Sequence, residues 1–113
     1  MKWTIEYIKE AERDLRKIEP HSRLLILKAI EKTAERPLPP PDGIGKPLGN
    51  HAASKLSGYF KIKLKSLGYR VVYGLKKEKG VMKIIVIGIR DDEAVYKEAE
   101  RRIKALADSP KDS

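Results

Sequence analysis

The segment that most constrains the fold runs from Tyr59 to Tyr73 and reads YFKIKLKSLGYRVVY. Its two arms, 59–65 and 69–73, alternate apolar and polar residues on either side of Ser66-Leu67-Gly68, which predicts a β-hairpin with a short glycine-containing turn. Because successive side chains of a strand point to opposite faces, the apolar residues of the first arm face a core and its lysines face away. These lysines are Lys61, Lys63 and Lys65.

The composition favours a single basic domain. The chain has 113 residues, with 25 Lys and Arg against 16 Asp and Glu, a net charge of +9. We expect one domain at residues 1–107 and a flexible tail at 108–113. The positive charge favours a polyanionic partner, nucleic acid first. The absence of cysteine excludes disulfides, cysteine zinc ligands and thiol nucleophiles.

Hydrophobic periodicity predicts the remaining elements. Alternation over 2–7 predicts a first strand, and apolar residues at helical spacing predict helices over 8–18 and from Ser22 to Arg36, with a turn at 20–22. The irregular segment 38–53 predicts a long loop.

The last part of the chain contains a strand and a helix. The apolar run VMKIIVIGI at 81–89 predicts a central strand covered on both faces. Arg90 follows it directly, and Asp91-Asp92-Glu93 opens a final helix, whose stripe is Val95, Ala99, Ile103 and Leu106. No apolar run is long enough to cross a membrane, and the N-terminal segment is charged from Lys2 onward, so we expect a cytoplasmic protein without membrane contact.

The predicted order is β-α-α-β-β-β-α. Strands joined by tight turns pair antiparallel, and helices joined by a short connection pack as an antiparallel hairpin. We therefore predict an α+β fold, in which an antiparallel sheet of about four strands carries the N-terminal helical hairpin on one face. The other face would be partly open and basic.

The chain resembles the RelE toxins of bacterial and archaeal type II toxin–antitoxin systems, within the RelE/ParE superfamily. The resemblance extends from Lys2 to about Ile103 and is carried by GYFKIKLKSLGYRVVYGL, by VIGIRDDEAVY and by the KPLGN loop. Its most specific part is a pair of alternate lysines, a GYR return strand, an arginine that ends the last strand and a tyrosine six residues later. It implies a RelE-like fold and a metal-independent, cofactor-free endoribonuclease that cuts messenger RNA in the ribosomal A site.

The family's catalytic residues correspond here to Lys61, Lys63, Arg70, Arg90 and Tyr96. In the implied reaction the 2′-hydroxyl attacks the adjacent phosphate, leaving a 2′,3′-cyclic phosphate and a 5′-hydroxyl. Lys63 is the candidate base, since crowded cations favour its neutral form.

The other residues of the set have electrostatic or positioning roles. Lys61 and Arg70 would hold the non-bridging oxygens, Arg90 would stabilise the leaving oxygen, and Tyr96 would stack on a base or orient the attacking hydroxyl. Lys55 and Lys65 are candidate substrate-binding residues.

Ordinary structural roles compete with these assignments. Strand lysines often form a solvated face, and Tyr96 is one of the residues beside the apolar stripe of its helix. Acidic residues 91–93 fit a helix start better than a metal site, and His21 and His51 have no feature that would bring them together. Ile89 stands where many relatives carry a basic residue or histidine, which removes one candidate RNA contact.

Two other functions remain open at this point. One is a ParE-like toxin that inhibits DNA gyrase, and the other is a non-catalytic nucleic-acid-binding module. The resemblance also implies a cognate acidic antitoxin similar to RelB, which would cover the basic face, and ribosomal RNA as a further partner. The toxin itself would be a monomer when free and part of a hetero-oligomer with its antitoxin.

Overall fold

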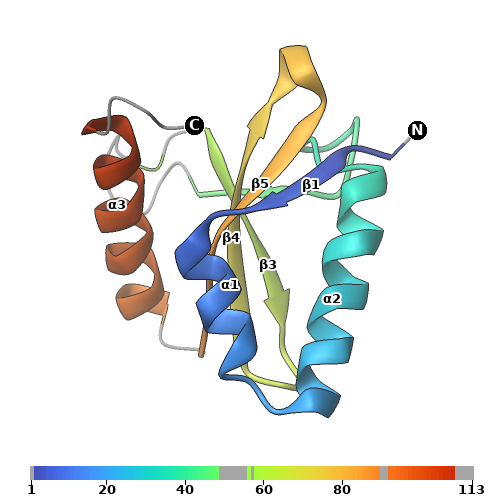
Figure 1. Cartoon of the computed structure of the whole chain (residues 1–113). Coiled ribbons are helices and arrows are strands. Elements are labelled where there is room, and N and C mark those ends of the chain that lie inside the picture. The colour runs from blue at the N-terminus through green and yellow to red at the C-terminus, as the bar shows by residue number, and fades with distance from the viewer. Residues whose placement is uncertain (1, 49–55, 57, 90–91, 109–113) are drawn as a thin grey trace.

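The computed structural model describes residues 2–48, 56, 58–89 and 92–108 and has the predicted α+β fold. Figure 1 shows α1 and α2 beside one side of the sheet and α3 apart from them. The elements in chain order are β1 (Thr4–Tyr7), α1 (Lys9–Arg16), α2 (Pro20–Glu35), β2 (Lys46–Pro47), β3 (Tyr59–Leu64), β4 (Tyr69–Lys76), the 3₁₀ turn η2 (Lys77–Lys79), β5 (Val81–Ile89) and α3 (Asp92–Asp108).

The sheet is mixed and has five strands, in the order β1-β5-β4-β3-β2. Its centre is the predicted antiparallel meander of β3, β4 and β5, but β1 pairs with β5 in parallel, with Thr4 opposite Val81. The prediction of an all-antiparallel sheet was therefore wrong for β1. The tight-turn rule does not apply to a strand followed by two helices, since such a crossover can return the chain in either direction. The fifth strand, β2, has only two residues and is too short to show alternation.

The first core lies between the sheet and the two N-terminal helices. Ala11, Ile26 and Ile30 pack there against side chains of β4 and β5. Tyr73 is fully buried in this core, where its ring stacks on Phe60 with centroids 5.3 Å apart. Its hydroxyl donates a 2.9 Å hydrogen bond to the Pro37 carbonyl, and burial raises the pKa of Tyr73, so the donor proton is retained.

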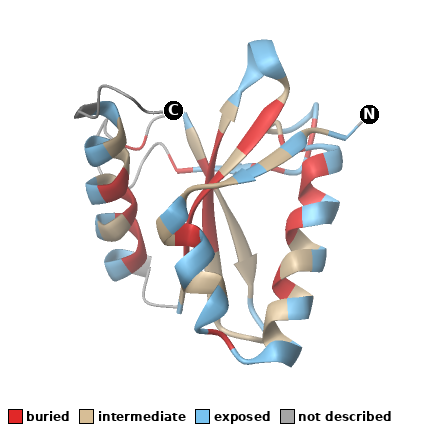
Figure 2. Ribbon diagram, in the orientation of Figure 1, coloured by how far each residue is buried: buried red, intermediate tan, exposed pale blue. Residues whose placement is uncertain are grey.

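A second core lies on the opposite face, where α3 packs on β4 and β5. Figure 2 shows buried residues along the sheet-facing sides of α2 and α3. The stripe predicted for the last helix is confirmed, with Val95 and Ala99 buried and Ile103 and Leu106 packed against the cluster. The molecule thus has three layers. The prediction that this face would be partly open was wrong for the part under α3, because a helix with an apolar stripe needs a surface to cover.

A bulge in β5 determines which of its side chains face each core. Val72 pairs with Val86, but the next residue, Tyr73, pairs with Ile84, so β5 contains one extra residue. Because of the bulge, Ile84 and Ile87 both face the first core, while Ile85 and Val86, which lie between them, both face the second. In an unbulged strand Ile84 and Val86 would have shared one face. The expectation that 81–89 is covered on both faces is confirmed.

Helix α2 begins at Pro20, two residues before the predicted start. The Glu19 carboxylate accepts hydrogen bonds from the backbone N–H groups of His21 and Ser22 at 3.1 and 2.7 Å, and therefore caps the helix. Proline suits the first helical position because its missing N–H would have no helical partner there. Pro20 therefore starts α2 rather than forming a turn before it.

The Tyr73 hydrogen bond gives a first prediction, tested by Tyr73→Phe. This change leaves the buried Pro37 carbonyl without its donor and should lower the free energy of unfolding by about 1–3 kcal/mol. Tyr69→Phe, at a half-buried position of the same strand, is the matched control and should change it by less than about 0.5 kcal/mol. Urea unfolding followed by Trp3 fluorescence measures both values. Equal losses in the two variants would contradict the assignment.

Candidate functional site

The predicted lysine face is on the side of the sheet that carries α3. On β3, Phe60 faces the first core and Ile62 packs against it, so the alternating Lys61 and Lys63 face the other way. Lys61 pairs with Val72, a residue of the second core, which identifies the same face independently. Helix α3 lies over β4 and β5, so the expectation of an open basic surface applies to β3 and the start of β4.

Four cationic side chains meet on this face. Lys63 lies directly opposite Arg70 across β3 and β4, and Lys61 lies opposite Lys46 across β3 and β2. Directly opposed Cβ atoms are about 4.5–5.5 Å apart, and like charges in such pairs lower stability. An anion such as a phosphate, bound between these side chains, would offset that repulsion. Lys46 was missed by sequence reasoning, because β2 is too short to be recognised as a strand.

A cleft of about 240 Å³ lies beside this cluster, at the edge of β3. Its walls include Thr33 of α2 and Ile44, and its cationic wall is formed by Lys46, Lys61 and Lys63. Since β2 pairs only with Phe60 and Lys61, the rest of this edge of β3 is not covered by a strand, and the cleft lies there.

Tyr96 lies next to Lys61. The Lys61 ammonium is 6.0 Å from the centroid of the Tyr96 ring, within cation–π range. Tyr96 is 5% exposed, so in this conformation its ring packs in the second core rather than presenting a face for base stacking. The geometry therefore favours a role for Tyr96 in orienting the Lys61 ammonium.

The close approach of α3 to β5 sets the position of Tyr96. A Cβ atom at Gly88 would lie 2.9 Å from the Val95 Cγ2 atom, too close for two carbon atoms. Gly88 pairs with Arg70, so glycine here lets the start of α3 lie beside the cationic cluster.

Three of the predicted catalytic residues, Lys61, Lys63 and Arg70, share one face, and Tyr96 reaches it from α3. Lys65 is exposed in the turn that follows β3. Arg90, Lys55 and His51 lie outside the described residues. Ile89, in the position before Arg90, is 68% exposed. His21 is an exposed residue of α2.

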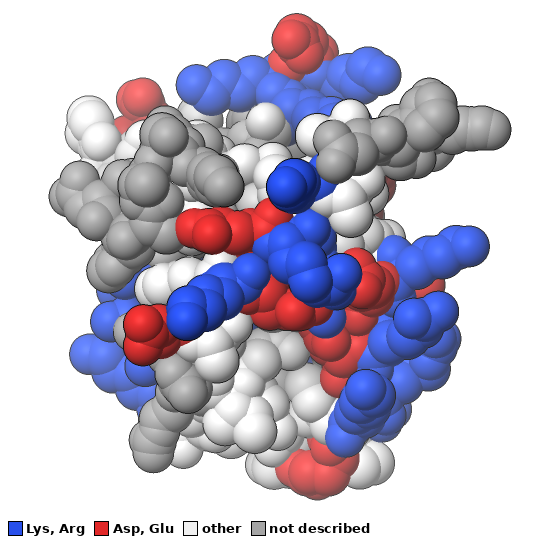
Figure 3. Space-filling model, turned by 90° about the vertical axis from the view of Figure 1, so that its left-hand side faces the viewer, with Lys and Arg blue, Asp and Glu red and all other residues white. Residues whose placement is uncertain are grey.

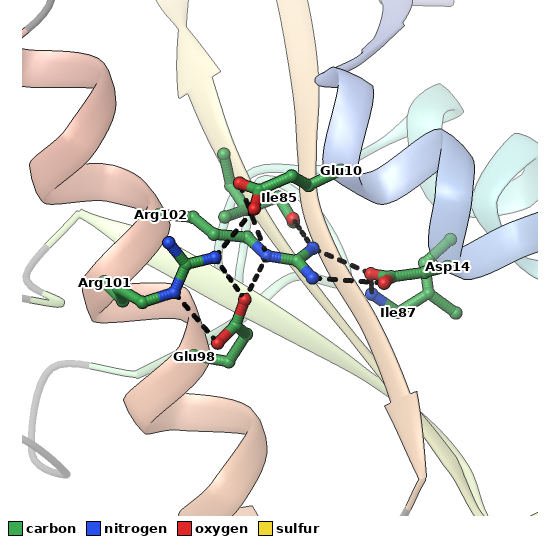
Figure 4. Close-up of polar contacts among 7 residues, drawn as sticks. All are labelled: Glu10, Asp14, Ile85, Ile87, Glu98, Arg101 and Arg102. Atoms are coloured by element: carbon green, nitrogen blue, oxygen red, sulfur yellow. Dashed lines mark hydrogen bonds and ion pairs between the residues drawn. The ribbon is translucent and has the colours of Figure 1, made fainter.

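A buried ion pair that the sequence reasoning did not anticipate connects α3 to α1 (Figure 4). Arg102 is 8% exposed and donates from Nη1 and Nη2 to the two Asp14 carboxylate oxygens at 2.8 and 3.1 Å. Arg102 Nη1 also donates to the Ile85 carbonyl at 2.9 Å, and the Ile87 N–H donates to Asp14 at 3.0 Å. Both side chains therefore bind the backbone of β5 at its bulge, just after Ile84, the last residue of β5 that pairs with β1.

This ion pair continues into a surface network. Glu98 accepts from Arg101 at 2.7 and 3.1 Å and from Arg102 Nε at 2.6 Å, while Arg101 also donates to Glu10 of α1 at 2.7 Å. The Arg101 hydrogen bonds, followed by that from Arg102, lower the pKa of Glu98 from 4.5 to about 2. Burial lowers the pKa of Arg102, but its bonds to Asp14 and Glu98 outweigh burial and raise it overall.

The surface charges on the α3 side are mixed. Figure 3 shows Asp and Glu side chains between Lys and Arg side chains across the middle of this view. On this face the Lys and Arg side chains therefore do not form one continuous basic surface. This makes the all-cationic group on β2, β3 and β4 more distinctive as an anion site.

The described residues offer no group of three or more acidic or histidine side chains that could hold a metal ion. None of the described helices has the length and apolarity needed to cross a membrane.

Comparisons with known proteins place the chain in a family. A family model described as the ParE toxin of the type II toxin–antitoxin system parDE matches residues 5–94. The mRNA interferase toxin RelE of Escherichia coli K12 is 48% identical over 54 residues, which are 45% of this chain and 57% of RelE. The matched segment thus spans little more than half of that relative.

Solved structures match over more of the chain. A free-state E. coli RelE variant with two arginines replaced by alanine is 30% identical, has a TM-score of 0.72, and is matched over 91% of this chain and 99% of its own. The toxin–antitoxin complex RelBE2 of Mycobacterium tuberculosis contains a chain that is 25% identical with a TM-score of 0.64, matched over 80% of this chain and 100% of its own.

The Glu98 network predicts a pH dependence of stability. Because the pKa of Glu98 is depressed in the folded state, its contribution is complete above about pH 4.5 and is lost as the pH falls toward about 2. Urea midpoints followed by circular dichroism should fall across this window in the parent and fall less in Glu98→Gln. Glu100→Gln, on the same helix outside the network, should keep the parent profile. An unchanged profile in Glu98→Gln would contradict the role of this carboxylate.

Proposed function

This chain belongs to the RelE/ParE superfamily as a RelE-type toxin of a type II toxin–antitoxin system, and we propose that it is an mRNA endoribonuclease, an mRNA interferase that cuts messenger RNA in the ribosomal A site. One domain, residues 1–107, would carry the activity. Translated messenger RNA, the proposed substrate, would locate the protein in the cytoplasm.

The observation that carries this proposal is the group of opposed cations on one sheet face. Lys63 faces Arg70, and Lys61 lies between Lys46 on β2 and Tyr96 on α3. Such a group suits a phosphate whose negative charge increases during the reaction. The similarity to RelE, a protein named as an mRNA interferase, supports RNA as the source of that phosphate.

The proposed reaction breaks the P–O5′ bond as the 2′-oxygen bonds to phosphorus. Acting as the base, Lys63 takes the 2′-hydroxyl proton, and a solvent water gives a proton to the departing 5′-oxygen, which leaves a 2′,3′-cyclic phosphate and a 5′-hydroxyl. Lys63 then returns its proton to solvent. Lys61 and Arg70 bind the non-bridging oxygens. Arg90 stabilises the leaving oxygen electrostatically, since a guanidinium with a pKa above about 12 is a poor proton donor.

The proposed partners follow from the same charges. A RelB-like acidic antitoxin would neutralise the cationic face, as suggested by the toxin–antitoxin complex among the similar structures. The toxin would be a monomer when free. Ribosomal RNA would meet exposed basic residues of the first two helices and of the turn after α1 by phosphate contact. These are Arg13, Arg16, Lys17 and Lys28.

A second candidate function is gyrase inhibition, favoured by the match to the ParE family model. It does not require Lys63 opposite Arg70, so this pair favours RNA cleavage. A binding module without activity would also use the lysines. The two alternatives and the proposal give different results in cleavage and supercoiling assays.

Substitution of the opposed cations tests the proposal. Lys63→Ala should lower the rate of mRNA cleavage about 10²–10⁴-fold by removing the base, and Arg70→Ala about 10²–10³-fold by removing a phosphate contact. Primer extension on a translated messenger, with and without ribosomes, measures the cuts. Lys79→Ala changes an exposed lysine at the opposite end of β4 and should cut as the parent does.

The alternatives predict other outcomes. Absence of cuts by the parent, together with inhibited gyrase supercoiling, would establish the ParE-like function instead. RNA binding that survives both substitutions, without cleavage by the parent, would establish a binding module.

A further inference from the structure

The Asp14–Arg102 pair lies where the sheet lacks a strand. The pairing of β1 with β5 ends at Tyr7 and Ile84, and the Ile8 N–H then donates to the Ile84 carbonyl at 3.2 Å. Just beyond, Arg102 donates to the Ile85 carbonyl and Asp14 accepts from the Ile87 N–H. Two side chains from opposite layers thus serve the backbone groups that a neighbouring strand would serve.

The geometry of the pair depends on the arginine fork. Arg102 contacts both oxygens of Asp14, the Ile85 carbonyl and Glu98, so its nitrogens bind in three directions. A lysine ammonium is a single point charge and cannot make this set of contacts together. Arg102 therefore restricts movement of α3 both along β5 and perpendicular to it. A single charge pair would restrict the position of the helix less.

Apolar packing gives the later part of α3 less support. A cleft of about 320 Å³ lies between Ile103, Leu106 and Ala107 of the helix and residues such as Gly74 and Lys83 of the sheet. Before this cleft, the helix meets the sheet through Val95 at Gly88 and through Ala99. Arg102 makes its polar contacts between these two regions, six residues after Tyr96, about 9 Å along the helix.

We propose that Asp14 and Arg102 are positioning residues for RNA cleavage, which hold α3 on the bulge of β5 so that Tyr96 lies over Lys61. The inference rests on the proposed function. Neither residue touches the cationic face; they act through the placement of Tyr96.

A double-substitution cycle tests this link. Arg102→Met should lower kcat about ten- to hundredfold with KM within about twofold, because a displaced group weakens the reacting geometry more than substrate binding. In a Tyr96→Leu background the same change should cost less than about twofold, since the residue through which Arg102 acts is gone. Losses that multiply independently would overturn the proposal. Arg102→Lys, the conservative variant, should also lower kcat.

Arg101→Met is the matched control. Arg101 is the adjacent residue on α3, is exposed, and pairs with Glu98 and Glu10 without contacting β5. It should retain parental kcat. If Arg102→Met does not fold, Arg102→Lys and Asp14→Asn carry the cycle, with urea unfolding to establish that each is folded. A loss in Arg101→Met equal to that in Arg102→Met would overturn the inference.

A nuclear magnetic resonance experiment separates this inference from the proposed function. Nuclear Overhauser contacts between the Lys61 side chain and the Tyr96 ring should be present in the parent and in Arg101→Met and absent in Arg102→Met. Persistence in Arg102→Met would overturn the positioning role whether or not RNA is cut. A parent that shows these contacts and cuts no RNA would instead overturn the proposed function, and with it the catalytic consequence of the pair.

Discussion

The structure depends on β5, which two cores share. An apolar strand buried on both faces needs partners on both, and the bulge at Ile85 sends Ile84 and Ile87 to one core and Ile85 and Val86 to the other. The same irregularity leaves backbone groups at the sheet edge, where Asp14 and Arg102 bind them. Breaking such a buried pair by removing one partner typically costs about 3–5 kcal/mol, since it strands the other charge.

The candidate site lies on the part of the sheet that α3 does not cover. Helix α3 covers β4 and β5, so the outer face of β3 and the start of β4 can carry Lys61, Lys63 and Arg70. Gly88 lets the helix approach closely enough for Tyr96 to reach Lys61. The opposed cations gain no stability from one another, and a bound anion would offset their repulsion.

Local patterns in the sequence were sufficient for most of the fold. The alternation at 59–65 and the apolar run at 81–89 correctly predicted the hairpin, the central strand and the face on which the lysines lie. The parallel pairing of β1 was not predictable from neighbouring turns, because it depends on contacts made across two helices. The prediction of a partly open second face was wrong where α3 lies, because the apolar stripe of this helix packs on β4 and β5.

The missed ion pair had a visible signal. Asp14 lies three residues after Ala11, and Arg102 three after Ala99, so each interrupts a helical apolar stripe with a charge. Opposite charges at two such positions indicate a buried ion pair. Only the structure shows that the two side chains, from helices on opposite faces of the sheet, contact each other beside β5. For the site itself, the positions of Arg90 and Lys55 and the roles of all the residues stay predictions.

The chemistry of the RNA ends tests the central claim most directly. Fragments produced from a translated messenger should carry 2′,3′-cyclic phosphate and 5′-hydroxyl ends, because the 2′-hydroxyl is the nucleophile in the proposed reaction. A 5′-hydroxyl end accepts a phosphate from polynucleotide kinase without prior dephosphorylation, and a 2′,3′-cyclic phosphate resists phosphatase until acid opens the ring. Fragments with 5′-phosphate and 3′-hydroxyl ends would mean that water attacks the phosphate, and would contradict a site in which Lys63 activates the 2′-hydroxyl.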